Sequence, residues 1–284
     1  MSSVSVHSSA KVGGLELAYE TFGTTGPTVL LMMGQGTQML AWPDVFCGSL
    51  AAQGFRVVRF DNRDIGASTH VPGRSLRPYT LDDLAADAVG LLDVLEVPAA
   101  HLVGMSMGAM VAQLVTIAAP ERVLSLTCIA STTGSRSAGL PRPALLRRIP
   151  LRRNVSDRDQ AGELFSRIVQ AIGSPAFPID PAHLRDLGAR SYDRGHHPLG
   201  SLRQLVAVVR AGDRTSALRR VRVPTLVVHG DADPLVRVSG GRAVAAAVPG
   251  ARLVTVRGLG HDLPPQIWPL LVEEICAIVV QGER

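Results

Sequence analysis

The chain has 284 residues, of which 46% are hydrophobic and 19% charged, a composition typical of globular proteins that excludes wholesale disorder. Its apolar runs fall far short of the roughly 18 residues that a membrane-spanning helix needs, so we expect no membrane segment. The first ten residues contain neither a basic nor an apolar region, so we expect no export signal and a cytoplasmic protein. Three scattered cysteines indicate neither a disulfide framework nor a thiolate metal site.

The positive charge is unevenly distributed. Residues 134–222 hold 17 arginines against 7 acidic residues, a net charge of +10, and since the whole chain carries +5 the rest of it carries −5. Such a segment either favours an anionic partner or is a solvated helical surface, and we favour the second interpretation. Aromatic residues make up only 4% of the chain and no stacking motif accompanies the arginines, so we expect no nucleic-acid partner.

Strands and helices alternate along the first 130 residues. Residues 14–23 alternate as in an edge strand, whereas residues 28–33 form a continuous apolar run typical of a strand covered on both faces. Residues 80–95 have the pattern of an amphipathic helix, with Thr80 as N-cap and Asp83 three positions on. The other elements predicted here are a helix over 42–53, strands over 56–60, 101–105 and 123–130, and a helix over 107–119 that Pro120 ends.

The alternation stops between residues 134 and 222, where no strand is visible and helical stretches are separated by proline and glycine. It resumes afterwards, which predicts one α/β domain with a mostly parallel sheet, formed by residues 1–133 and 223–284, and a helical insertion over 134–222, called the insert below. The later elements are helices over 158–172 and 201–211 in the insert, strands over 224–230 and 252–257, and helices over 238–247 and 267–280.

The central motif is Gly-x-Ser-x-Gly, with its serine at Ser106 between a predicted strand and a predicted helix. A sharp turn in that context raises the serine above the sheet, and the flanking Gly104 and Gly108 prevent clashes. The helix N-terminus then lies beside the hydroxyl with unpaired N–H groups. This context indicates a nucleophilic serine rather than an incidental one.

A serine hydroxyl needs a base, which in turn is held by an acid. His261 and Asp233 each follow a predicted parallel strand, so both fall at the same sheet edge as Ser106, and the chain order is nucleophile, acid, base. Asp231 is the competing acid, but we favour Asp233, because its later position in the turn lets its side chain reach His261 instead of capping its own strand. We interpret His229 as a core histidine, His196 and His197 as polar surface residues, and Asp262 as pointing away from its neighbour His261.

Acyl transfer also needs donors for the developing oxyanion. The N–H of Met107, directly after the serine, is one candidate. The second is the N–H of Gln35, in the loop after the 28–33 strand, where glycines on both sides let the backbone approach a ligand. The same loop fits a dinucleotide fingerprint poorly, because Met39 stands at the third glycine position. We therefore expect neither a cofactor nor a metal.

Taken together, these motifs resemble those of the α/β-hydrolase superfamily, and among its members they are most similar to the aclacinomycin methylesterase type of esterase. The resemblance is carried by Met33-Gly34-Gln35-Gly36, Trp42-Pro43-Asp44, residues 60–68, Gly104-Met105-Ser106-Met107-Gly108, His229-Gly230-Asp231-Ala232-Asp233-Pro234 and Gly258-Leu259-Gly260-His261-Asp262-Leu263-Pro264. It implies an eight-stranded, mostly parallel sheet with helices on both faces, a helical cap, and hydrolysis of a carboxylic ester. It assigns the nucleophile to Ser106, the acid to Asp233, the base to His261 and the oxyanion donors to Gln35 and Met107. The family's frequent histidine before the oxyanion glycine is Met33 here.

The leading hypothesis is therefore a serine hydrolase that cleaves a small hydrophobic ester, such as a methyl ester or lactone of polyketide type, through an acyl-enzyme. One alternative is thioesterase-type chain release, for which the basic insert suits an acidic carrier protein, or carbon–carbon bond hydrolysis on the same triad. Another is a catalytically slow ligand-binding protein. An apolar pocket is expected, with candidate lining residues Met39, Met105, Met107, Leu145, Leu146, Phe165, Ile168 and Phe177.

Overall fold

The computed structural model describes residues 6–147 and 155–283, in which eight strands form one sheet in the order β1-β2-β4-β3-β5-β6-β7-β8. Strands β1 and β2 and strands β2 and β4 pair antiparallel, and every other pair is parallel. The predicted eight-stranded, mostly parallel sheet is thus confirmed. The strands are β1 (Val6–Val12), β2 (Leu15–Phe22), β3 (Thr28–Met32), β4 (Arg56–Phe60), β5 (Ala100–Met105), β6 (Val123–Ile129), β7 (Thr225–Gly230) and β8 (Arg252–Val256).

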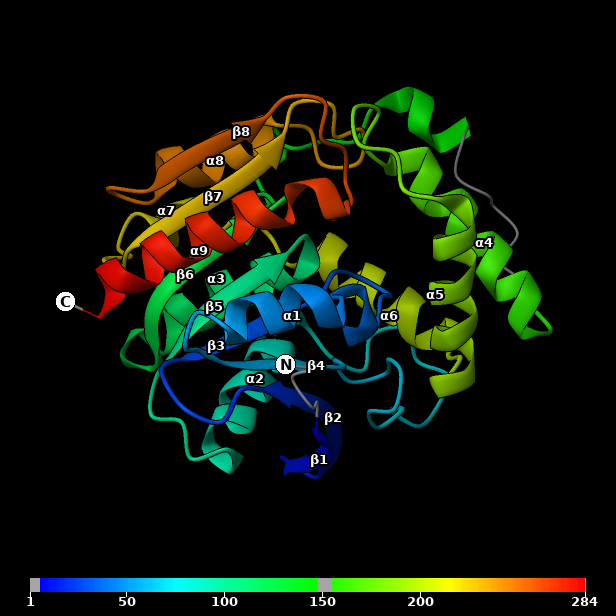
Figure 1. The fold of residues 1–284 in the computed structure, drawn as a ribbon, viewed down its shortest axis with the longest axis horizontal. Helices are drawn as coiled ribbons and strands as arrows, with labels where there is room; N and C mark the ends of the chain where they lie inside the picture. The colour runs from blue at the N-terminus through cyan, green and yellow to red at the C-terminus, as the bar shows by residue number, and fades with distance from the viewer. Residues whose placement is uncertain (1–5, 148–154, 284) are drawn as a thin grey trace.

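Helices connect the parallel strands and cover both faces of the sheet (Figure 1). They are α1 (Asp44–Ala51), α2 (Leu81–Val94), α3 (Met107–Ala118), α4 (Arg158–Ile172), α5 (Pro181–Arg194), α6 (Pro198–Arg210), α7 (Thr215–Leu218), α8 (Ser239–Ala247) and α9 (Trp268–Gly282), with short 3-10 turns at Met39–Ala41, Pro120–Arg122, Pro143–Arg147 and Pro265–Ile267.

Two apolar layers hold the helices to the sheet. Leu30 and Met32 of β3 pack in the layer that includes α2, α3 and α8, whereas Val29 and Leu31 pack in the layer of α1 and α9. Successive side chains of a strand point to opposite faces, so a strand covered on both sides is apolar throughout, as the 28–33 run predicts. The predicted N-cap is confirmed too: Thr80 and Asp83 form a reciprocal capping box at the start of α2.

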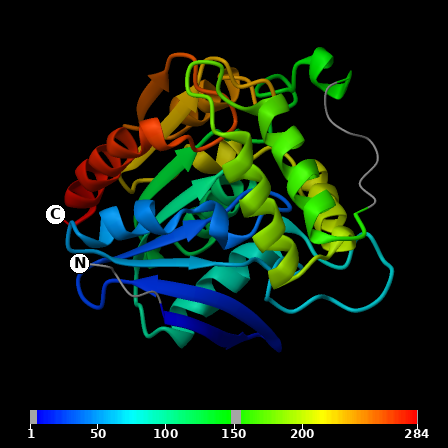
Figure 2. The same ribbon diagram turned by 45° about the vertical axis from the view of Figure 1, so that its right-hand side comes forward.

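The described part of the insert contains helices and no strand, as expected. Helices α4 and α5 pack along each other beyond the carboxyl ends of the parallel strands (Figures 1 and 2). The chain therefore brings two kinds of element to this edge of the sheet: the loops that follow the strands and the helices of the insert.

Candidate active site

Ser106 lies at a strained turn between β5 and α3. Its backbone has φ +54° and ψ −117°, a conformation that is unfavourable for a residue with a side chain and that recurs at functional sites. The turn is tight on both sides: a Cβ on Gly104 would lie 2.4 Å from Gly108 O, and one on Gly108 would lie 2.1 Å from Met32 O. The two glycines of the motif are thus required by close backbone approach, as the sequence predicts.

Three side chains form a hydrogen-bonded chain at this edge. His261 Nε2 lies 3.0 Å from Ser106 Oγ, and His261 Nδ1 lies 2.7 Å from Asp233 Oδ2. Ser106 follows β5, Asp233 follows β7 and His261 follows β8, so the parallel strands bring together groups up to 155 residues apart. The structure thus brings together the three residues singled out from the sequence.

The carboxylate of Asp233 is buried and fully engaged. Its Oδ1 accepts the N–H groups of Leu235 at 2.8 Å and Val236 at 2.9 Å. Burial alone would raise the pKa of Asp233, but the charge of His261 and the hydrogen bonds from its neighbours outweigh burial and lower the pKa to about 2. The acid is therefore held ionised, with Oδ2 directed at the histidine.

A second histidine lies behind this acid. His229 is fully buried, as expected of a core histidine, and its Nε2 lies 2.7 Å from Val236 O and 3.6 Å from Asp233 Oδ2. Nε2 carries the proton, because only an N–H can donate to that carbonyl. Sequence reasoning missed the proximity of His229 to Asp233, although its place four residues before Asp233 at the end of the same strand was a signal for it.

The other polar candidates have different hydrogen-bond partners, although Asp262 and His197 line the same cavity as Ser106. Asp231 is exposed and accepts the Gly258 N–H at 2.7 Å. The carboxylate of Asp262 accepts hydrogen bonds from the hydroxyl and the N–H of Ser174, just after α4. Burial raises the pKa of Asp262 despite these bonds. The interpretation of His197 as a polar surface residue is wrong, because its ring is half-buried, lies 3.5 Å from an oxygen of Asp64 and stacks on the imidazole of His70.

The two candidate oxyanion donors belong to segments next to the nucleophile. Met107 is the first residue of α3, and Gln35 follows Gly34, on which a Cβ would lie only 3.3 Å from the Cβ of Ser106. Within the described residues neither the Met107 nor the Gln35 N–H donates to a protein acceptor. This pair is where the sequence predicts an oxyanion hole.

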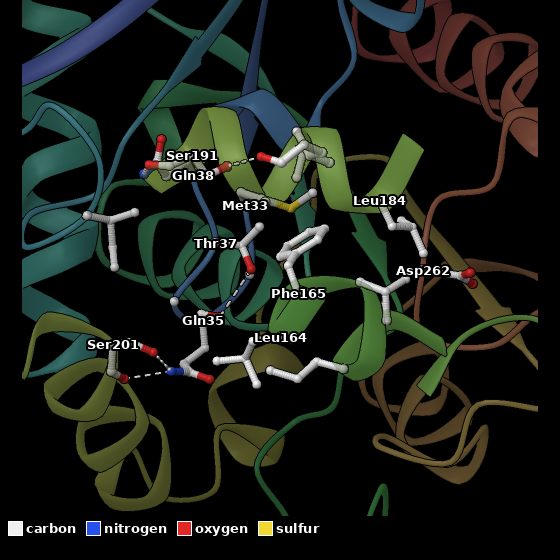
Figure 3. A pocket seen from close by; sticks show the side chains of 18 of the residues that line it. Met33, Gln35, Thr37, Gln38, Leu164, Phe165, Leu184, Ser191, Ser201 and Asp262 are labelled. Atoms are coloured by element: carbon white, nitrogen blue, oxygen red, sulfur yellow. Dashed lines mark hydrogen bonds between the residues drawn. The ribbon is translucent and has the colours of Figure 1, made fainter. Parts of the chain in front are cut away.

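A cavity of about 690 Å³ opens above Ser106 and His261. Its walls are mostly apolar and come from both the core and the insert; Met33 of the core and Phe165 and Leu164 of α4 are among the lining side chains drawn in Figure 3. The predicted lining by Met105, Phe165 and Ile168 is confirmed. The prediction is wrong for four residues that line no part of this cavity and are buried or packed in the core: Met39, Met107, Leu145 and Phe177. The side chain of Leu146 lies outside the described part of the chain.

In the described ranges 6–147 and 155–283, no group of three or more histidine, cysteine, aspartate or glutamate side chains is arranged to hold a metal ion. None of the helices in these ranges combines the length and apolar composition that crossing a bilayer requires.

Comparison with known proteins places this geometry in a family. Residues 27–265 match the model of the α/β-hydrolase fold. A rhodomycin D methylesterase from Streptomyces peucetius is 34% identical over 88% of this chain and 89% of its own length. A 2-hydroxy-6-oxononadienedioate/2-hydroxy-6-oxononatrienedioate hydrolase from Pseudomonas putida is 28% identical over 87% of this chain and 85% of its own. A hydrolase structure from Pseudomonas aeruginosa superposes with a TM-score of 0.72 at 28% identity, covering 96% of this chain and 98% of that one.

Proposed function

The chain belongs to the α/β-hydrolase family, and on that premise we propose that it cleaves carboxylic esters with Ser106 as nucleophile, His261 as general base and Asp233 as the acid that orients the base. The observation that carries the proposal is the continuous chain of hydrogen-bond distances, 3.0 Å from Ser106 Oγ to His261 Nε2 and 2.7 Å from His261 Nδ1 to Asp233 Oδ2. A residue adopts the strained conformation of Ser106 only where the surrounding structure enforces it, which supports a functional serine.

The reaction proceeds in two halves. As Ser106 Oγ attacks the ester carbonyl, His261 Nε2 takes its proton and then gives that proton to the departing alcohol, leaving an acyl-enzyme. A water molecule, deprotonated by the same nitrogen, attacks the acyl-enzyme and releases the acid and the free serine. Asp233 remains ionised throughout and keeps the Nδ1 proton of His261 facing away from the reaction. The Gln35 and Met107 N–H groups stabilise the oxyanion of both tetrahedral intermediates.

We further propose that the substrate is a bulky hydrophobic ester bound under the insert, which acts as a cap over the core. The size and apolar walls of the cavity support this substrate class, as does the name of the methylesterase relative. The arginines of the insert give little support to an acidic carrier protein, because several pair locally: Arg158 with Asp193, and Arg167 with Glu163.

The test is hydrolysis of matched substrates by the wild type and S106A. We expect the wild type to release p-nitrophenol from p-nitrophenyl butyrate and methanol from methyl esters of polycyclic aromatic acids, with S106A slower by about five to six orders of magnitude in kcat. An acyl thioester and a vinylogous 1,5-diketone acid serve as comparison substrates for the two alternative reactions. The proposal would be refuted if S106A hydrolysed every ester at the wild-type rate. If the wild type preferred a comparison substrate to the esters, the corresponding alternative reaction would replace ester hydrolysis.

A further inference from the structure

The loop that carries the oxyanion donor Gln35 is held by α6, a helix of the insert. The side-chain Nε2 of Gln35 donates to the carbonyl oxygen of Ser201 at 2.6 Å and lies 2.9 Å from its hydroxyl oxygen (Figure 3). Ser201 stands in the first turn of α6, 166 residues further along the chain. One side of the oxyanion loop is therefore fixed by the insert and not by the core.

Gln204, one turn further along α6, reaches the same loop. Its side chain is fully buried, and its Oε1 accepts the N–H of Gly36 at 2.8 Å. Its Nε2 donates to the carbonyl of Arg63 at 3.2 Å. Both ends of this amide are thus engaged, which a buried amide needs, because an unpaired polar group costs about 1–3 kcal/mol. The amide therefore has one defined orientation, with its oxygen toward the oxyanion loop.

Gly36 makes this close approach possible. Its φ is +69°, in the left-handed region that favours glycine, and a Cβ here would lie 2.3 Å from Ser201 Oγ and 3.2 Å from Ser201 Cβ. A residue with a side chain at this position would push the loop away from α6. The close contact therefore depends on residues of both segments, on Gly36 in the loop and on Ser201 and Gln204 in the helix.

We propose that Gln204, supported by Ser201, is a positioning residue for the oxyanion hole. Together they hold Gln35 by its side chain and by the peptide bond that follows it, so its own N–H, which has no acceptor in the described residues, stays available to the carbonyl oxygen of the ester that Ser106 attacks. The insert then contributes to transition-state stabilisation as well as to covering the cavity. This inference rests on the proposed ester hydrolysis.

The test compares Q204M, which keeps the length of the side chain but loses its acceptor, with Q204E, whose buried carboxyl, when protonated, keeps an acceptor for the Gly36 N–H and a donor for the Arg63 carbonyl. For p-nitrophenyl butyrate we expect kcat of Q204M to fall by about 10- to 100-fold, since loss of a whole oxyanion donor costs about 10²- to 10³-fold. KM should change by less than about threefold, because the donor acts in the transition state. Affinity for a trifluoromethyl ketone, whose adduct carries an oxyanion, should fall with kcat, and Q204E should recover most of both losses.

A merely structural role for Gln204 predicts a different pattern. Q204M would then unfold more easily but keep its turnover per titrated active site and its affinity for the ketone, and that result would overturn the inference. The acid limb of the pH profile of kcat/KM depends on the general base and not on the oxyanion donors. We therefore expect this limb to bend at the same pH in Q204M as in the wild type, and a shift would also count against the inference. V209A changes an exposed side chain of the same helix and should behave as the wild type in every assay.

Two further outcomes separate this inference from the proposed function. A wild type that neither hydrolyses esters nor reacts with a fluorophosphonate overturns both. An active wild type with an equally active Q204M overturns the inference alone. If Q204M does not fold, S201A carries the test, with an expected fall in kcat of about two- to fivefold because the Ser201 carbonyl contact remains; unchanged kcat in S201A would then refute the role of α6.

Discussion

Replacing Asp233 with asparagine is a sharp probe of the hydrogen-bond chain, because the surroundings dictate how the new amide must sit. Asp233 Oδ1 accepts two backbone N–H groups, from Leu235 and Val236. An amide NH₂ cannot accept, so the oxygen of the asparagine must occupy that place and its nitrogen must face His261. The nitrogen donates a proton, and His261 must then present a bare Nδ1 and carry its proton on Nε2, facing Ser106.

A histidine in this tautomer cannot take the serine proton. The expected loss in kcat for D233N is about 10⁴-fold, or about 5 kcal/mol of transition-state stabilisation, with little change in KM. The fold should persist, because the backbone hydrogen bonds and the side-chain volume are both retained. The predicted effect is thus a loss of chemistry without a loss of structure.

D231N is the matched control, since Asp231 follows the same strand two residues earlier but is exposed and accepts only the Gly258 N–H among the described residues. We expect its kcat for p-nitrophenyl butyrate to stay within about threefold of the wild type. Circular dichroism and a thermal melt of both variants establish that they are folded. D233N with more than a tenth of wild-type kcat, or D231N with the larger loss, would refute the assignment of the acid.

Three other predictions follow from local geometry. The pKa of Asp233 is lowered to about 2 from its ordinary 3.8, so above about pH 4 its charge stabilises the fold by about 2 kcal/mol. The difference in the free energy of urea unfolding between the wild type and D233N should therefore shrink as the pH falls from 5 toward 2. A difference that stays constant over this range would contradict the prediction. G260A would place a Cβ 2.3 Å from the backbone of Gly173, so it should displace the loop of His261 and lower both kcat and the melting temperature; wild-type kcat would refute that coupling. T80A removes a helix cap far from the site and should cost about 1 kcal/mol of unfolding free energy with kcat unchanged.

Much of the candidate site follows from sequence because it depends on strand ends. Parallel strands bring their carboxyl ends to one edge, so Ser106, Asp233 and His261 are placed near one another by the positions of three apolar runs. The position of Asp233 in the turn after its strand is the reason to favour it over Asp231. In the structure the side chain of Asp233, and not that of Asp231, contacts His261. The resemblance to the α/β-hydrolase superfamily is confirmed over most of the chain.

Other features could not be predicted from local pattern. Strand β1 was missed because its residues are largely polar, although the Gly13-Gly14 pair before β2 was an available hairpin signal. The contacts of Gln204 and Ser174 with the loops of Gln35 and His261 link segments 86 to 168 residues apart and depend on how the insert folds back over the core. Periodicity identifies a helix face, but it does not identify the loop that the face will contact.

The proposed activation of Ser106 is tested by intact mass after treatment with a fluorophosphonate. The probe is incubated with the wild type and S106A in parallel, and both are checked for folding. We expect a single adduct on the wild type and none on S106A. A folded wild type without an adduct, or an adduct of equal extent on S106A, would contradict the proposed activation.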